Sequence, residues 1–132
     1  VEKAIGEVRR RGGVIGGTSA GAAAQSEVMI TGGRTEATTA AGFGWLAGTV
    51  VDQHFLKRDR FARLMSVLDR HPAVIGIGID EGTAVVARGR TLEVIGESYV
   101  VVLRANGKVR PLDVRVLKAG DSLSLAEAPA PK

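Results

Sequence analysis

The sequence of 132 residues contains no cysteine and few aromatic residues, with one tryptophan, one tyrosine and three phenylalanines. The absence of cysteine excludes disulfides, thiolate metal ligands and a cysteine nucleophile. The scarcity of aromatic side chains argues against a surface on which nucleic-acid bases stack. No run reaches the roughly eighteen consecutive apolar residues that a membrane-spanning helix needs. We therefore expect binding to neither nucleic acid nor a membrane.

What the chain does contain is typical of one soluble globular domain: 45% hydrophobic residues, 24% charged residues and a net charge of +4. The basic residues gather at positions 9–11 and 57–63, without interleaved aromatic residues. This distribution favours an acidic substrate over nucleic acid as the partner. Residues 1–125 are expected to form one folded unit, and residues 126–132, with two prolines, a flexible tail.

The first half of the chain is predicted to run helix, strand, sharp turn, helix. Apolar residues at helical spacing predict a helix over residues 1–11, ended by two glycines. Val14 and Ile15 then predict a short strand, and the alanine-rich Ala20–Met29 a second helix. A long polar and glycine-rich loop is expected to follow, up to a short strand at Thr49–Val51.

The second half is predicted to contain one amphipathic helix and several strands. Residues 57–70 place four large apolar residues on one helical face, and Ala73–Ile79 has the continuous apolar pattern of a buried parallel strand. Three short strands, Thr83–Val86, Thr91–Ile95 and Tyr99–Leu103, are expected to form an antiparallel meander. The fold class predicted from this order is α/β, with a parallel sheet flanked by helices.

Gly17-Thr18-Ser19-Ala20-Gly21 is a G-x-S-x-G sequence between a predicted strand and a predicted helix. In that position it favours a nucleophilic serine on a strained turn. The amide of Ala20 would then be placed to donate to an oxyanion. The alternative is a glycine-rich turn in which Ser19 merely caps the following helix.

His54 follows the predicted strand Thr49–Val51, at the kind of strand end where such sheets place their chemistry. His71, beside a proline at a helix end, is interpreted as a bystander. Polar residues are unusually dense around His54, and arginines three and five positions apart reach one region from adjacent helical turns. These residues are Asp52, Gln53, Arg58, Arg60 and Arg63.

Two adjacent carboxylates, Asp80 and Glu81, stand at the end of the predicted parallel strand and can supply the acid that orients a histidine. Side chains alternate across a strand, so at most one of the two can face His54. A solvated strand end with turn-forming residues is the alternative. The resulting order of serine, histidine and acid differs from the order in α/β-hydrolases.

The sequence resembles the cyanophycinases and the related aspartyl dipeptidases, which are serine peptidases. Three blocks carry the resemblance: Gly16–Ala22, Asp52–Leu64 and Gly76–Ala84. The resemblance implies a flavodoxin-like fold similar to class I glutamine amidotransferases, with Ser19 as nucleophile, His54 as general base and Glu81 as the orienting acid. Asp80 is the fallback for that acid. No metal or organic cofactor is implied. The implied substrate pocket comprises Asp52, Gln53, Arg58, Arg60 and Arg63.

The activity implied by this resemblance is hydrolysis of cyanophycin, a polyaspartate that carries arginine side groups, to β-Asp-Arg dipeptides. A dipeptidase acting on N-terminal aspartyl peptides is the alternative enzyme, and a non-catalytic binding module of the same fold is the alternative class. Family members are longer than this chain, so it is expected to be the C-terminal half of a peptidase. Its expected partners are the N-terminal half and, when complete, a second copy. The cytoplasm is the expected compartment, with export left open.

Overall fold

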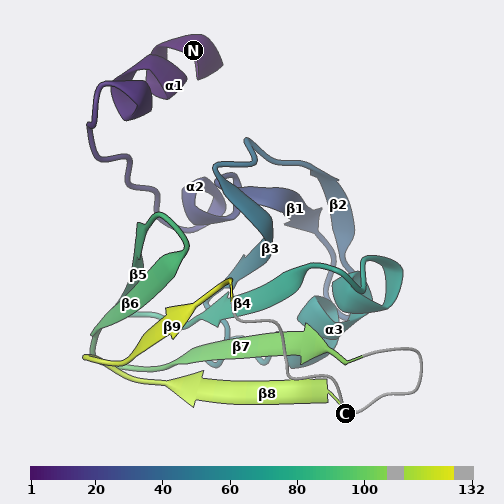
Figure 1. Cartoon of the computed structure of the whole chain (residues 1–132). Helices are drawn as coiled ribbons and strands as arrows, with labels where there is room; N and C mark the ends of the chain where they lie inside the picture. Colours follow the sequence, from purple (N-terminus) through teal and green to yellow (C-terminus); the bar gives the residue numbers. More distant parts are fainter. Residues whose placement is uncertain (107–111, 127–132) are drawn as a thin grey trace.

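The computed structural model describes residues 1–106 and 112–126 (Figure 1). The tail expected at 126–132 lies almost wholly outside the described residues. The described chain forms an α/β fold, as its sequence predicts. Its elements in chain order are α1 (Glu2–Arg10), α2 (Ala20–Ala23), β1 (Ser26–Gly32), β2 (Thr38–Ala41), β3 (Leu46–Gln53), α3 (Phe61–Arg70), β4 (Ile75–Ile79), β5 (Thr83–Arg88), β6 (Thr91–Gly96), β7 (Val100–Ala105), β8 (Leu112–Leu117) and β9 (Ser122–Ser124).

The strands form one six-stranded and one three-stranded sheet. The large sheet has the order β2-β1-β3-β4-β7-β8, and the small one β5-β6-β9. Strand β3 lies parallel to both β1 and β4, which confirms parallel strands at the centre of the fold. The pairs β1–β2, β4–β7 and β7–β8 are antiparallel, so the described sheet is mixed.

The large sheet is covered on both faces, because its central strands are apolar on both sides. Neighbouring residues of β3 show this alternation: Val50 packs with Leu64 and Leu68 of α3, whereas Val51 packs with Leu92 of the small sheet. Val51 is 3% exposed, and each of the other four residues is at most 1% exposed. The molecule is therefore layered as helix α3, large sheet, small sheet, with α2 beside the small sheet.

The first half of the chain departs from its prediction in two places. Val14 is 95% exposed and the segment it lies in is not a strand, because no strand of the described residues pairs with it. The alanine-rich helix ends at Ala23 instead of Met29. The Ser26 hydroxyl donates to the carbonyl of Ala23, and the following residues pair with β3 as strand β1. Sheet pairing has overridden a helix propensity that alanine alone suggested.

The expected antiparallel meander is divided between the two sheets. Strands β5 and β6 do form an antiparallel hairpin, but β7 pairs with β4 and β8, and β9 takes the place beside β6. The reason lies in burial: Val100, Val101, Val102 and Leu103 are all buried, so β7 needs cover on both faces. Only an inner position in the large sheet gives that cover.

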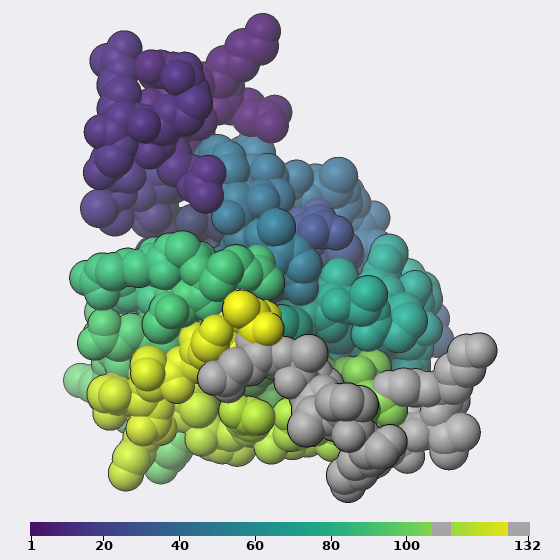
Figure 2. All heavy atoms as spheres, viewed as in Figure 1, coloured from purple at the N-terminus to yellow at the C-terminus, as the bar shows by residue number. Residues whose placement is uncertain are grey.

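Helix α3 keeps the apolar face predicted from sequence, but it begins at Phe61, four residues later than expected. Residues 57–59 form a turn instead. At ten residues α3 is the longest described helix, and none of the described helices is long and apolar enough to span a membrane. Helix α1 contains no buried residue and projects from the body of the protein on an extended segment (Figures 1 and 2).

Candidate active site

The parallel pairing of β3 and β4 brings two of the predicted site segments together. Gln53 is the register partner of Ile79, so the residues that follow, His54 and Asp80, leave the sheet at the same edge. The pairing continues one step further, because the amide of Phe55 donates to the carbonyl of Ile79 over 3.1 Å. The carboxyl ends of adjacent parallel strands thus hold the histidine beside the two carboxylates.

Ser19 stands on a strained turn immediately before α2. Its backbone has φ 52° and ψ −120°, a conformation that costs a non-glycine residue on the order of 1–3 kcal/mol. Its side chain does not cap α2, which removes the alternative role suggested by its position. The Ser19 hydroxyl instead forms a 3.2 Å hydrogen bond with Nε2 of His54.

The turn before Ser19 requires a glycine at position 17. A Cβ atom there would overlap the carbonyl oxygen of Gly21 and the side chain of Gln25. The segment therefore folds back on the start of α2 at a distance that only glycine permits. This close approach fixes the position of the backbone at Ser19, and with it the direction in which the Ser19 side chain points.

His54 is hydrogen-bonded on both ring nitrogens. Its Nδ1 lies 2.9 Å from Oε1 of Glu81, while Nε2 faces Ser19. A carboxylate can only accept, so the proton of the neutral imidazole lies on Nδ1 and Nε2 is left as an acceptor for the serine hydroxyl. The side chains of His54 and Glu81 are 27% and 47% exposed, so the group is open to solvent.

Asp80, the fallback for the acid, points elsewhere. Its Oδ1 accepts from the amides of Leu56 and Lys57, and its Oδ2 accepts from the hydroxyl of Ser98 over 2.6 Å. Burial by itself would raise the pKa of Asp80, but these hydrogen bonds and one from the amide of Glu81 outweigh it and hold that pKa below its usual value. Asp80 is therefore a firmly ionised acceptor.

Two of the residues expected in the substrate pocket are buried inside the protein. Asp52 is 0% exposed and Arg63 is 5% exposed, and the guanidinium of Arg63 grips both carboxylate oxygens of Asp52. Arg63 also donates to the carbonyl of Gly33 over 2.9 Å. Neither side chain can touch a substrate in this arrangement, which corrects the expectation of direct contact. Together they tie the end of β3 to α3 and to the loop after β1.

Gln53, Arg58 and Arg60 remain available at the surface or close to it. Arg60 donates to both the carbonyl and the side-chain oxygen of Gln53 and lies 3.6 Å from Asp52. Burial, followed by repulsion from Arg63 and Arg58, lowers the pKa of Arg60, while Asp52 acts in the opposite direction. The guanidinium groups of Arg60 and Arg63 thus share the carboxylate of Asp52, and Arg58 adds a third positive charge close to Arg60.

The Ala20 amide also stays close to the serine, as the sequence indicates. Among the hydrogen bonds of the described residues none is donated by this amide, whereas the next two amides donate to Thr18 and Ser19. An amide with that freedom, one residue after Ser19, is of the kind that can stabilise an oxyanion. Helix α2, with four residues, is too short to add a helix dipole of its own.

Residues 1–95 match the family model described as peptidase family S51. The chain belongs to this family. Similar proteins include cyanophycinases from Geminocystis herdmanii, 44% identical over 75% of this chain and 38% of that protein, and from Synechococcus elongatus, 45% identical over 68% of this chain and 30% of that protein. A crystal structure of a peptidase from an acI-B1 Actinobacterium aligns at a TM-score of 0.53 and 30% identity, covering 80% of this chain and 43% of that one.

The chain thus spans about a third of the length of these curated relatives of family S51.

Sequence reasoning missed the part that Ser98 plays in this site. Ser98 lies far from His54 in the chain, and nothing in its immediate sequence marks it, since only the close packing of the β6–β7 connection against Asp80 brings it near. The described residues contain no cluster of three or more histidines and carboxylates suited to a metal.

Proposed function

We propose that this chain carries the catalytic residues of a serine peptidase of family S51, with Ser19 as nucleophile, His54 as general base and Glu81 as the acid that orients the histidine. The observation that carries the proposal is the continuous hydrogen-bonded series from Ser19 Oγ through both nitrogens of His54 to Glu81. The strained backbone of Ser19 supports it, because residues held in sparsely populated backbone conformations cluster at active sites.

The chemistry that these groups support is acyl transfer. Ser19 Oγ attacks the scissile carbonyl carbon while His54 Nε2 takes the hydroxyl proton, and the Ala20 amide donates to the developing oxyanion. The C–N bond then breaks, and His54 returns the proton to the leaving nitrogen. Water adds to the acyl-enzyme as His54 removes its proton. The ester C–O bond breaks, the acid product leaves and Ser19 regains its proton.

We propose cyanophycin as the substrate, cleaved to β-Asp-Arg dipeptides. The curated relatives carry the name cyanophycinase, and the guanidinium groups of Arg58 and Arg60 suit a substrate rich in free carboxylates. In this proposal Arg58, Arg60 and Gln53 contact the substrate. Asp52 and Arg63 act beneath them and hold Arg60 in place.

An aspartyl dipeptidase is the second candidate. The burial of Asp52 favours it, because this carboxylate is already paired and cannot receive the guanidinium of an arginine-containing substrate. Such a dipeptidase needs recognition of an aspartate alone, which the arginine cluster can also provide.

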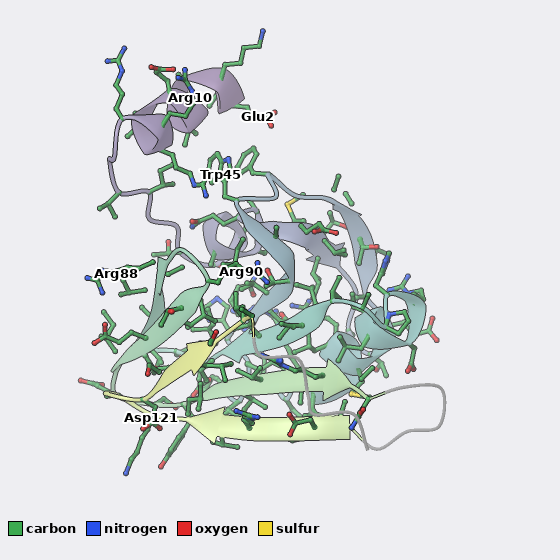
Figure 3. All side chains as sticks on the ribbon, in the orientation of Figure 1. Glu2, Arg10, Trp45, Arg88, Arg90 and Asp121 are labelled. Atoms are coloured by element: carbon green, nitrogen blue, oxygen red, sulfur yellow. The ribbon has the colours of Figure 1, made fainter. Side chains whose placement is uncertain are left out.

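The test compares cyanophycin with N-terminal aspartyl dipeptides as substrates for the complete polypeptide. We expect release of β-Asp-Arg from cyanophycin, and a loss of kcat/KM in Arg58→Ala and Arg60→Ala that corresponds to about 1.5–3 kcal/mol each. Arg88→Ala, an arginine on the β5–β6 hairpin (Figure 3), is the control and should keep its activity. Faster cleavage of the dipeptides would favour the second candidate, and failure to react with a fluorophosphonate probe would favour a binding module.

The partners are also proposals. Since the relatives are longer, we propose that an N-terminal segment supplies a second oxyanion donor and further substrate contacts, and that the complete enzyme is a homodimer in the cytoplasm. Co-expression of these 132 residues with such a segment should then give activity that the chain alone lacks. Full activity of the isolated chain as a monomer would contradict this part of the proposal.

A further inference from the structure

Asp80 connects three separate segments next to the proposed catalytic residues. Its Oδ1 accepts hydrogen bonds from the amides of Leu56, at 3.1 Å, and Lys57, at 2.9 Å, two and three residues after His54. Its Oδ2 accepts from the hydroxyl of Ser98, in the connection between β6 and β7. One carboxylate thus joins the end of β4 to the turn that carries His54 and to a third segment.

The turn that carries His54 needs such support. His54 has φ 50°, in the left-handed region that a residue with a Cβ rarely adopts. The same turn is closed by two backbone hydrogen bonds: the amide of Arg58 donates to the carbonyl of His54, and the amide of Arg60 donates to the carbonyl of Phe55. These bonds lie within the turn itself. The bonds to Asp80 are different, because they fix the turn relative to strand β4.

Glu81 is held by the same group of residues. The amide of Ser98 donates to the hydroxyl of Thr83, and that hydroxyl donates to the carbonyl of Glu81. Ser98 therefore reaches both Asp80, through its hydroxyl, and the backbone of Glu81, through Thr83. The histidine and its acid are positioned by one connected set of hydrogen bonds.

We propose that Asp80 is a positioning residue for the reaction: by holding the Leu56 and Lys57 amides it sets the place of His54 between Ser19 and Glu81, with Ser98 orienting the carboxylate. The proposal rests on the function proposed for Ser19 and His54. In this proposal the role of Asp80 differs from that of Glu81, the acid whose carboxylate faces His54. Asp80 acts through the backbone of the turn and does not touch the reacting atoms.

The hydrogen bonds to Asp80 are charge-assisted, because the lowered pKa of its carboxyl keeps it ionised at neutral pH. Loss of the side chain would remove both amide contacts and release the turn. A displacement of about 1 Å at a catalytic group can cost on the order of a hundredfold in rate. We therefore expect the Asp80→Ala variant to react about 10- to 100-fold more slowly.

The test measures the rate at which a fluorophosphonate probe labels the complete polypeptide, a reaction in which Ser19 Oγ forms the P–O bond, fluoride leaves and His54 takes the proton. Asp80→Ala is compared with Asp121→Ala, because Asp121 also accepts a turn amide, that of Lys118, but does so in the turn between β8 and β9 (Figure 3). Melting temperatures of both variants are recorded. Asp80→Asn keeps an oxygen that can accept the two amides, so it should recover most of the labelling rate.

A merely structural part for Asp80 would lower the melting temperature without a specific effect on labelling. Each change is therefore repeated in a His54→Ala background. We expect Asp80→Ala to slow labelling only when His54 is present, and Asp121→Ala to leave the rate unchanged in either background. With the substrate, we expect Asp80→Ala to lower kcat and to leave KM nearly constant.

Wild-type labelling by Asp80→Ala would overturn the inference, and so would an equal loss in the His54→Ala background, since the effect would then not act through the histidine. Ser19→Ala separates these results from a failure of the proposed function. If Ser19→Ala is still labelled at the wild-type rate, Ser19 is not the nucleophile, and both the function and this inference are wrong. If Ser19→Ala is unlabelled while Asp80→Ala reacts normally, only this inference is wrong.

Discussion

Two polar pairs lie at the end of strand β3, one containing Asp52 and the other His54. The first pair is buried and the second is open to solvent. The side chains of Asp52 and Arg63 are 0% and 6% exposed, whereas those of His54 and Glu81 are 27% and 47% exposed. Both pairs join a strand end to another element. The buried pair has no room for a substrate, so its contribution is to the fold, and the open pair faces a strained serine and has the geometry for chemistry.

The difference teaches that residue type alone does not separate a binding residue from a supporting one. Charged residues concentrated around His54 all look functional in the sequence. Burial divides them, because a fully buried charge needs its partner inside the protein and cannot exchange it for a ligand. Changes at the two clusters should consequently affect different quantities.

The largest effect is expected at the open cluster. Ser19→Ala should lower turnover by roughly 10⁶-fold, as loss of the nucleophile does in other serine hydrolases, because His54 then has no hydroxyl to activate. Stability should be unchanged, since one small exposed hydroxyl is removed. Turnover and thermal melting of the complete polypeptide measure both. A His54→Ala change should cost nearly as much, and the double variant little more; additive losses would place His54 outside the reaction.

The buried cluster should show the reverse pattern. Arg63→Ala leaves the buried carboxylate of Asp52 with only the Gln53 amide and Arg60 at 3.6 Å as partners, and we expect this to destabilise the protein by up to about 3–5 kcal/mol. The free energy of unfolding in urea is the measurement. Arg88→Ala breaks the exposed pair between Arg88 and Glu93 and should cost about 0–1 kcal/mol. Similar losses in the two variants would mean that the comparison between buried and open clusters has no energetic basis.

A smaller change between the two clusters should affect fold and chemistry together. A Cβ at position 78 would overlap the ring of Phe55, which is 1% exposed and follows His54 directly. Gly78→Ala should therefore cost about 1–3 kcal/mol in stability and also lower activity. Gly76→Ala, in the same strand, meets the buried side chain of Leu64 less closely, at 3.2 Å, and is the matched control. Equal activity of both variants would argue against a link between Phe55 and His54.

The smallest expected effect is on the stability of the protein at low pH. The pKa of Asp80 is lowered in the folded protein, so its carboxylate contributes stability above its unfolded pKa of about 4, and that contribution is lost as the pH falls through the lower folded value. Asp80→Asn should therefore be less stable than wild type at neutral pH, and the two unfolding free energies should converge below about pH 4. Parallel curves from pH 7 to acid would show that Asp80 has no depressed pKa.

The elements that the sequence predicts well are those whose pattern has one interpretation. The apolar face of α3 and the continuous apolar run of β4 need cover of a specific kind, and the structure provides it. Helix α1 follows from local spacing alone. By contrast, the alanine-rich segment after Ser19 favours a helix by propensity, and only the pairing of β1 with β3 turned its end, from Ser26 on, into a strand.

The sequence by itself determined that a serine, a histidine and two carboxylates lie at the ends of structural elements, because motif spacing and strand ends are local properties. Which carboxylate faces His54, and which charged residues are buried, was decided by the tertiary structure alone. Asp80 and Glu81 are adjacent, and their different directions depend on the parallel register of β3 and β4 and on Ser98. Arg63 and Arg58 are the same residue type and differ in burial, which depends on how α3 packs over the sheet, and no single segment of the chain contains that information.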